Sequence, residues 1–449
     1  MKIPESPPSP GDVVSDLAND PERLRRLLVV PVGPVDPRGR YLHWDDMRSR
    51  TPPGGLSRAE WWFTTSRARN ALARPLPLLT VDGSAFRFCN VDEIQEAVHQ
   101  IDQKASGEIA ADEVVTDLRR SNRYLVSSLI EEAITSSQLE GASTTRRVAK
   151  DMLETGRPPR DNSERMIVNN YRAMLAVQTM VDQPLAPDDV LGIHQLLVED
   201  TLANPDAAGR MQTPDDKRIG VYWHDNTLLH QPPPAEQLPA RMEAMCRFAN
   251  GETPDGFLHP VTRAIILHFW VGYDHPFEDG NGRTARALFY WCMLHNGYWL
   301  VQYLSVSSIL RRAPAQYARS YLRTETDSND TTYFVLYQLD VIDRSIKSLH
   351  EYLARKMAES REIDALLRGS DLLNHRQVPI IHDALSDPDE PFTIAAQARR
   401  HRVAYQTART DLLELERLGL LVRDVRRRKF VFRSPPDLAR RLRAVGAGS

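Results

Sequence analysis

Residues 275–286 read HPFEDGNGRTAR, and this stretch decides how the rest of the chain is interpreted. Its first residue is a histidine, whose ordinary pKa of about 6.5 leaves the ring neutral at physiological pH and able to accept a proton from a hydroxyl. Four residues later, Asp279 supplies a hard carboxylate oxygen of the kind that holds magnesium beside substrate phosphates. We therefore expect His275 to act as a general base and Asp279 to bind Mg²⁺.

The glycines that follow favour phosphate binding. Around Asn281, Gly280 and Gly282 allow a turn whose successive N–H groups point into one anion-binding concavity. The next residues, RTARALFYWCML, have a helical period, so the turn lies at a helix N-terminus that also attracts negative charge. Arg283 and Arg286 are three residues apart, and this spacing predicts that both guanidinium groups lie on one face. The nucleotide-binding residues are thus predicted to be 280–283 and Arg286.

Together these residues resemble the motif of the Fic family, HPFx(D/E)GNGRxxR, at every specified position. The resemblance implies transfer of AMP from ATP to a Ser, Thr or Tyr hydroxyl of a protein, with His275 as base and Mg²⁺ on Asp279. It also implies that the 280–282 loop and the two arginines hold the phosphates. Asn281 separates the sequence from a kinase-like branch of the family. The alternative without function is that two turns merely connect two core helices.

A second motif lies upstream, at residues 136–141, which read SSQLEG. The pattern (S/T)xxxE(G/N), with Ser136 and Glu140, resembles the inhibitory helix of many Fic proteins. A carboxylate against Arg286 would occupy donors meant for the γ-phosphate and would repel the triphosphate. In some relatives the same glutamate orients a water that removes AMP, so removal stays open beside transfer. We expect Glu131 and Glu132 to be helix charges that face solvent.

Residues 209–232 predict a small hairpin within otherwise helical sequence. The β-prone run Arg218, Ile219, Gly220 and Val221 is followed by turn residues at 224–226 and by three prolines. This segment resembles the flap with which the family clamps its target, so these four residues are expected to dock the target protein. His194 and His268, on apolar helical stretches, are expected to be core histidines.

The C-terminal residues 393–449 carry 13 arginines and one lysine against five carboxylates, a net charge of +9 in a chain of net charge −3. Helical patterns at 378–385, 393–402 and 405–418, followed by two short strands within 420–433, have the order of a winged helix-turn-helix. Its predicted DNA contacts are Tyr405, Gln406 and Arg409 near the recognition helix, and Arg427 and Arg428 at the wing tip. The alternative is a module for protein contact or homodimer formation.

The expected fold class is mainly α, a helical Fic core with a β-hairpin flap and a C-terminal winged helix-turn-helix. The expected domains are a Pro-rich lead-in without long regular elements (1–90), a helical region with the inhibitory helix (91–160), the catalytic domain (161–360) and the basic module (370–449). An apolar content of 41% and a charged content of 26% are ordinary for globular proteins.

The remaining sequence features restrict the compartment and the partners. The three cysteines, at 89, 246 and 292, have no CxxC spacing and are expected to be buried thiols. No signal peptide and no apolar run of membrane-spanning length is present, which predicts a cytoplasmic protein without membrane contact. The partners expected are a protein target, with the chain itself as one candidate, and DNA through residues 370–449. A DNA-binding regulator is therefore an alternative to the enzyme.

Overall fold

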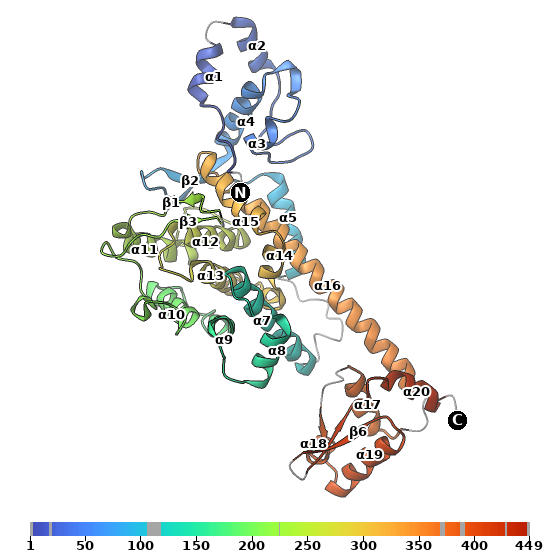
Figure 1. The fold of residues 1–449 in the computed structure, drawn as a ribbon. Coiled ribbons are helices and arrows are strands. Elements are labelled where there is room, and N and C mark those ends of the chain that lie inside the picture. The colour runs from blue at the N-terminus through green and yellow to red at the C-terminus, as the bar shows by residue number, and fades with distance from the viewer. Residues whose placement is uncertain are drawn as a thin grey trace. The chain divides into compact units, whose positions relative to one another are not determined.

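The computed structural model describes residues 3–17, 20–105, 118–223, 225–368, 373–386, 391–426 and 429–446. The chain divides into two compact units, residues 1–347 and 348–449. Helices dominate both units and the strands are few and short, which confirms the expected mainly helical fold (Figure 1). In the described ranges no helix is both long and apolar enough to cross a lipid bilayer.

The proline-rich start is more regular than expected. It forms α1 (Pro10–Leu17), α2 (Pro21–Val29), α3 (Trp44–Met47), the 3₁₀ turn η1 (Pro53–Gly55) and α4 (Arg58–Leu72). The expectation of a lead-in without long elements was wrong because proline is tolerated in the first helical turn, where its missing N–H has no partner to lose. Ser57 and Glu60 then form a reciprocal capping box that starts α4.

An antiparallel hairpin follows α4 and connects it to the helical body. Its strands are β1 (Ala73–Leu79) and β2 (Ala85–Cys89), with Ala73 opposite Cys89. Within α4, the buried Arg69 donates to the carbonyls of Pro34 and Leu42 and to the Tyr333 hydroxyl. These hydrogen bonds tie the N-terminal segment to the start of the last helix of the unit.

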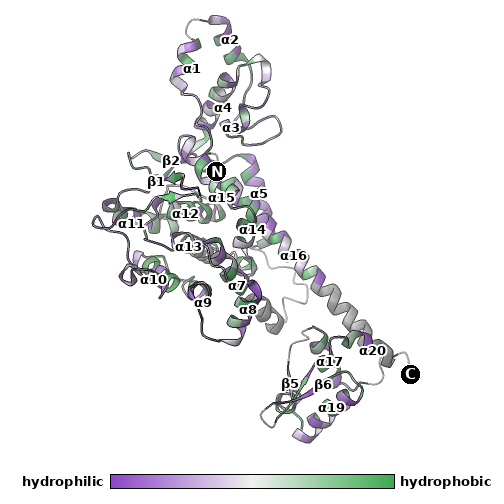
Figure 2. Ribbon diagram, viewed as in Figure 1, coloured by the Kyte–Doolittle hydropathy of each residue, from purple (hydrophilic) through white to green (hydrophobic). Residues whose placement is uncertain are grey.

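Two consecutive helices form the centre of the first unit, α12 (Pro260–Asp274) and α13 (Asn281–His295). Almost every residue of both is buried, and Figure 2 shows hydrophobic residues concentrated there. A helix that is apolar on all sides is stable only when it is surrounded by others. The turn between the two helices, residues 275–280, is therefore held from both ends by the core.

The helices around this pair complete the helical body of the first unit (Figure 1). On one side lie α7 (Leu118–Leu139), α8 (Arg146–Thr155), α9 (Asn162–Thr179) and α10 (Pro187–Val198). The other elements are α5 (Asp92–Ala105), η2 (Pro205–Ala207), η3 (Ala235–Gln237), α11 (Leu238–Ala249), η4 (Trp299–Tyr303), α14 (Val306–Arg312) and α15 (Pro314–Thr326). A cluster of Ile130, Ile134, Ala149, Met152 and Ile167 packs α7 against α8 and α9.

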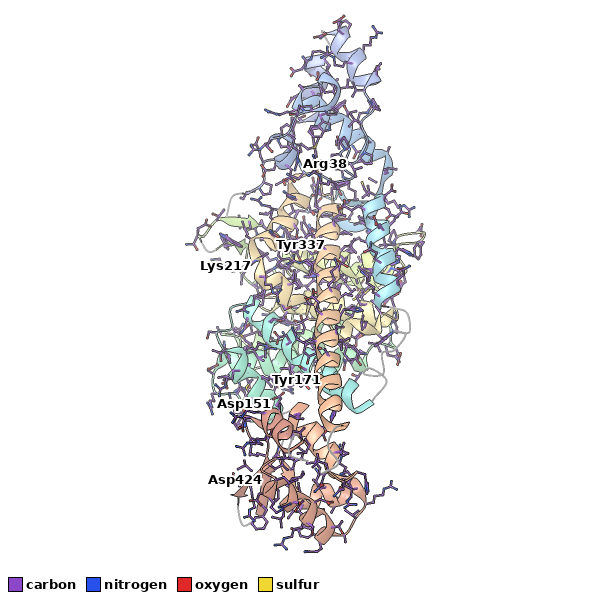
Figure 3. All side chains as sticks on the ribbon, turned by 90° about the vertical axis from the view of Figure 1, so that its right-hand side faces the viewer. Arg38, Asp151, Tyr171, Lys217, Tyr337 and Asp424 are labelled. Carbon is purple, nitrogen blue, oxygen red and sulfur yellow. The ribbon has the colours of Figure 1, made fainter. Side chains whose placement is uncertain are left out.

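The predicted hairpin is present but short. Its strands, β3 (Val221–Tyr222) and β4 (Leu228–His230), pair antiparallel with Val221 opposite His230. The long helix α16 (Thr332–Arg368) begins in the first unit, where Phe334, Val335 and Leu339 are buried. Figure 3 labels Lys217 in the segment before β3 and Tyr337 on α16.

The second unit has its own hydrophobic core, which includes Ile381, Phe392, Leu412 and Phe432. In chain order its elements are α17 (Gln377–Ser386), β5 (Phe392–Thr393), α18 (Ile394–His401), α19 (Tyr405–Arg417), β6 (Val422–Arg426), β7 (Lys429–Arg433) and α20 (Leu438–Gly446). The three strands form one antiparallel sheet in the order β5-β7-β6. The sequence predicted the three helices and two of the strands, but not β5 or α20.

Candidate active site

The turn between α12 and α13 is closed by its own hydrogen bonds. His275 ends α12 in the left-handed region (φ 45°, ψ 55°), and its N–H donates to the Val271 carbonyl at 2.9 Å. Gly280, at φ 83°, precedes α13. The Asn281 amide donates to the Phe277 carbonyl at 2.8 Å and accepts from the Phe277 N–H at 2.9 Å. The side chain of Asn281 therefore shapes the loop instead of pointing at a ligand.

His275 is half-buried, and its surroundings favour the neutral ring. Burial, together with the charges of His230 and Arg218, lowers the pKa of His275 to about 4. At neutral pH the imidazole is therefore unprotonated and can accept a proton.

The two arginines of the motif are buried and only partly hydrogen-bonded. Arg283 donates from Nη1 to the Leu197 carbonyl at the C-terminus of α10, at 2.8 Å. Its Nε and Nη2, and Nη1 of Arg286, are buried without a hydrogen-bond partner. Unsatisfied buried donors are costly, and guanidinium groups most of all, unless a ligand provides the acceptor. The site therefore has a place for an anion with several oxygens, as a nucleotide phosphate chain has.

Close packing prevents side chains from filling this place. A Cβ built on Gly280 would lie 2.7 Å from Cγ1 of Val198 and 3.5 Å from Nε2 of His194. A Cβ on Gly282 would collide with a carboxylate oxygen of Glu140. The two glycines thus add no side chain of their own over the N-terminus of α13, as an anion site at a helix N-terminus requires.

Asp279 lies at the mouth of the turn with a side chain that is 60% exposed. One oxygen accepts from the Gly280 N–H at 2.6 Å and the other is 3.7 Å from Nη2 of Arg283. Among the described residues no group of three or more His, Cys, Asp or Glu side chains could hold a metal by itself. A single exposed carboxylate still fits Mg²⁺, which commonly takes one or two carboxylates and completes its shell with water and phosphate oxygens.

Glu140, just beyond the end of α7, lies directly against this site. One carboxylate oxygen accepts from Nη2 of Arg286 at 2.8 Å, across 146 residues of sequence. Arg286 also donates from Nε to the Ser136 hydroxyl at 2.9 Å and from Nη2 to the Ser136 carbonyl at 3.1 Å. The Arg286 side chain is 2% exposed and that of Glu140 is 30% exposed. The Glu140 carboxylate therefore occupies Nη2 of Arg286, next to Nη1, which has no hydrogen-bond partner.

The expectation that Glu132 faces solvent was wrong. Glu132 is 1% exposed and accepts hydrogen bonds from the Ser305 hydroxyl, the Ser307 N–H and the Ser307 hydroxyl at the start of α14. It lies one helical turn before Ser136, so Glu132 and Ser136 share the face of α7 that leads to Glu140, just beyond the end of the helix. Glu131 behaves as expected, because it is partly exposed and pairs with Arg146. No local pattern in the sequence distinguishes the two neighbouring glutamates.

His194 has a more specific place than that of an ordinary core histidine. Its ring stacks on Phe277 with centroids 3.7 Å apart, and its Nδ1 accepts from the Gly209 N–H at 3.1 Å. The proton is therefore on Nε2, which is 2.9 Å from the Asp279 carbonyl. Burial lowers the pKa of His194 to about 4, so this arrangement persists at neutral pH. His194 thus holds the backbone of the 275–280 turn through the Asp279 carbonyl and the ring of Phe277. His268 is buried as expected, with Nε2 2.8 Å from the Tyr317 hydroxyl.

The four predicted docking residues of the hairpin do not share one environment. Ile219 is 38% exposed, and Val221 lies in β3 beside the half-buried Gly220. Arg218 instead turns inward, where its guanidinium donates to the carbonyls of Pro233, Asp274 and His275. Its donors are used within the chain, which corrects its assignment as a docking side chain.

The predicted contacts of the basic module lie on the surface of the second unit as far as they are described. Tyr405 is 57% exposed, Gln406 is exposed and Arg409 is partly exposed, all in the first turns of α19. Arg427 and Arg428 lie outside the described residues.

Comparison with known proteins agrees with this geometry. Residues 184–293, which include the whole turn and both arginines, match the model of the Fic/DOC family. The chain contains a Fic domain. Curated relatives of this chain include proteins named protein adenylyltransferase Fic, from Nematostella vectensis (26% identical over 212 residues) and Drosophila grimshawi (27% over 205 residues). These alignments cover 45% and 44% of this chain but only 46% and 39% of the relatives.

The fold of the Fic chain also resembles a solved structure. The crystal structure of a Fic family protein from Desulfovibrio desulfuricans G20 aligns with a TM-score of 0.53 at 18% identity. The alignment covers 77% of this chain and 97% of that one. At this identity the similarity establishes a shared fold, and the chemistry has to be argued from the site.

Proposed function

We propose that the Fic domain transfers AMP from ATP to a hydroxyl of a protein side chain. The observation that supports this most directly is the set of buried, unpartnered guanidinium donors on Arg283 and Arg286 at the N-terminus of α13. A neutral histidine, His275, lies in the turn before that helix. A phosphate chain satisfies the donors, and the histidine provides a base beside it.

In the proposed reaction the target oxygen attacks the α-phosphorus, and the bond from that phosphorus to the bridging oxygen breaks. Pyrophosphate leaves with the negative charge, and the hydroxyl proton passes to His275. Arg283, Arg286 and the N–H groups of the α13 N-terminus hold the phosphates. Asp279 would hold Mg²⁺, which when bound neutralises phosphate charge.

We further propose that Glu140 inhibits this reaction. Its hydrogen bond to Arg286 occupies a donor beside the vacant Nη1, and its charge repels the γ-phosphate. ATP that binds in spite of Glu140 cannot then place its phosphates in the reactive position. Ser136 contributes by accepting from the same guanidinium. The hydrogen bond between Glu140 and Arg286 supports this proposal.

A labelling experiment tests the reaction and its direction. Glu140→Gly protein is incubated with Mg²⁺ and ATP labelled on the α- or the γ-phosphate, with this chain itself and lysate proteins as candidate targets. Transfer of α-label, and an added AMP mass on the intact variant where it modifies itself, are the expected results. Transfer of γ-label alone would assign phosphoryl transfer. Release of AMP from premodified protein that requires Glu140 would assign removal instead.

The buried Glu132 leads to a prediction about the same inhibition. Glu132→Gln replaces an acceptor by a donor opposite Ser305 and Ser307, so the end of α7, which carries Ser136 and leads into Glu140, loses an anchor. Unsatisfied buried groups cost about 1–3 kcal/mol. We expect basal AMP transfer to rise about three- to tenfold in the full chain.

The matched control is Glu131→Gln, the neighbouring glutamate, which pairs with Arg146 at the surface. In the Glu140→Gly background the Glu132 substitution should add little, because there is no inhibitory carboxylate left to displace. Unchanged basal transfer together with a lower unfolding temperature would show that Glu132 serves only the stability of the fold.

A specific observation favours a second function, binding of duplex DNA by the second unit. Between Pro391 and Thr410 the sequence has four arginines and no carboxylate. Among the described residues Arg399, Arg402 and Arg409 form no ion pair. The arginines farther along α19 and on α20 are paired, Arg417 with Glu414 and Arg440 and Arg441 with Asp437.

The unpaired arginines surround the turn between α18 and α19, near the exposed Tyr405 and Gln406. Unpaired positive charge attracts phosphates, and the order of helices and strands suits a winged helix with α19 in the major groove. We therefore include duplex DNA among the proposed partners.

Fluorescence anisotropy with the full chain and a labelled 30-base-pair duplex tests this second function. Arg409→Ala should weaken binding about five- to tenfold and lower the salt slope by about 1. Arg417→Ala, which removes the same charge from the other end of α19, is the control and should bind like the parent. Equal affinities of the two variants would contradict the proposal. Preference for a single-stranded RNA, or light scattering that shows a homodimer lost in Arg409→Ala, would assign the surface to those partners instead.

A further inference from the structure

The segment that precedes and includes the hairpin is hydrogen-bonded to four consecutive backbone carbonyls at the turn that carries His275. Nε2 of His230 lies 2.7 Å from the Tyr273 carbonyl, and Nη2 of Arg218 donates to the Asp274 carbonyl at 2.6 Å. Nη1 of Arg218 donates to the His275 carbonyl at 2.8 Å, and the Gln212 N–H donates to the Pro276 carbonyl at 2.8 Å. These are contacts between residues 212–230 and residues 273–276 of the chain.

The end of α12 explains why these donors are favourable. The last carbonyls of a helix have no partner within it, and they carry the negative end of the helix dipole. Cationic donors at this position satisfy the carbonyls and interact with the dipole. Arg218 is fully engaged, because it also donates to the Pro233 carbonyl and the Gln212 side chain.

His230 is the second cationic donor. Its Nε2 faces a carbonyl, which only accepts, and its Nδ1 lies 2.7 Å from a carboxylate oxygen of Glu325 on α15. Both ring nitrogens therefore need a proton when Glu325 is ionised. Burial works against the charge, but the hydrogen bond and charge of Glu325 raise the pKa of His230. The charge of Asp274, whose own pKa burial raises to about 6, also raises the pKa of His230.

His275 needs this support because of its backbone. It is a non-glycine residue at φ 45°, a conformation that is sparsely populated and persists only when its surroundings fix it. Its N–H is fixed by Val271, and its carbonyl is fixed by Arg218. The direction of the imidazole thus depends on the residues of the hairpin segment.

We propose that Arg218 and His230 are positioning residues of the transfer reaction, which fix the backbone of His275 to the segment that leads into the hairpin. The inference rests on the proposed AMP transfer. It assigns Arg218 to the geometry of the base and not to the target, and it makes the hairpin part of the support of the catalytic turn. Loss of Arg218 should therefore reduce kcat while the affinity for ATP stays the same, because the phosphate donors belong to α13.

Arg218→Met in the Glu140→Gly background is the first test, with Arg210→Met as its control. Arg210 lies in the same segment but pairs with Asp216 and with no residue of 273–276. We expect Arg218→Met to lower kcat about tenfold, less than the hundredfold that a misplacement of a full ångström costs. Arg218→Lys can reach one carbonyl but not two, so it should be intermediate. A kcat equal to that of the control would overturn the inference.

A pH profile tests His230 separately. Its charge is present below the raised pKa and lost above it, so kcat should fall as the pH rises through that value. Glu325→Gln should move this fall to lower pH, and His230→Gln, which keeps a donor but has no charge to lose, should remove it. An unchanged profile in both variants would contradict the role of His230.

Hydrogen–deuterium exchange of residues 272–282 provides a readout that does not depend on activity. Faster exchange in Arg218→Met than in Arg210→Met, at an unchanged unfolding temperature, supports the inference. Equal exchange overturns it, whatever the activity. If Glu140→Gly transfers no AMP to any target, the proposed function fails, and the exchange measurement still decides whether Arg218 and His230 hold the turn.

Discussion

His275→Ala, made in the Glu140→Gly background, is expected to lower AMP transfer by about 10²–10⁴-fold. The reason is that the imidazole is the only neutral base in the turn beside the phosphate donors, and alanine leaves the target hydroxyl without a proton acceptor. ATP affinity should be unchanged, because the phosphates are held by Arg283, Arg286 and the N-terminus of α13. Single-turnover transfer of α-label and calorimetric ATP binding measure the two quantities.

The pH dependence gives a second check on the same histidine. The pKa of His275 is lowered to about 4, so the ring is free to accept a proton at any pH above that value. On the acid side, transfer should therefore fall as the pH drops through about 4, with no acid limb near 6.5. His99→Ala, at an exposed histidine of α5, is the matched control. A transfer rate of His275→Ala within threefold of that of His99→Ala would exclude His275 as the base.

Glu140→Gly is expected to raise AMP transfer roughly 30- to 100-fold. A charge-assisted hydrogen bond contributes about 1.5–3 kcal/mol, and each 1.4 kcal/mol is a factor of ten. The lower part of that range applies to the bond alone, because the Glu140 side chain is 30% exposed, and repulsion of the γ-phosphate adds to it. The variant does not interrupt α7, which ends at Leu139. Initial rates with α-labelled ATP measure the increase.

Glu140→Gln distinguishes the effect of the negative charge of Glu140 from the effect of the size of its side chain. It keeps the size of the side chain and can still accept from Arg286, but it removes the repulsion, so its rate should lie between those of the parent and Glu140→Gly. The surface variant Glu131→Gln serves again as control. A Glu140→Gly rate no higher than that of the control would mean that the contact with Arg286 does not restrain the enzyme.

The sequence predicted a turn between two helices at 275–286 because the residues that form it are local. Asn281, Gly280 and His275 lie within seven positions of one another, and their backbone requirements are written in the residue types. The contact between Glu140 and Arg286 spans 146 residues, and only a family resemblance could suggest it. The mainly helical fold followed from the period of the apolar residues, which is a strong signal in long helices.

Other features depend on tertiary contacts that no local pattern encodes. Glu132 looks like its neighbour Glu131 in sequence, yet one is buried at the start of α14 and the other is at the surface. Arg218 lies in a β-prone run, and the direction of its side chain is set by carbonyls 56 and 57 residues away. The early helices were missed because prolines at first-turn positions were interpreted as helix breakers.

Ser136, four residues before Glu140, has a second effect besides its part in the inhibitory contact. It fixes the Arg286 guanidinium through its hydroxyl and its carbonyl, so the arginine stays ordered when the carboxylate is absent. A long, flexible side chain loses conformational entropy when it binds a ligand, and here that loss has already occurred. Loss of the carboxylate alone would thus leave a preorganised arginine, whereas displacement of the whole helix would leave a disordered one. Activation that keeps Ser136 in place is therefore entropically the more favourable route.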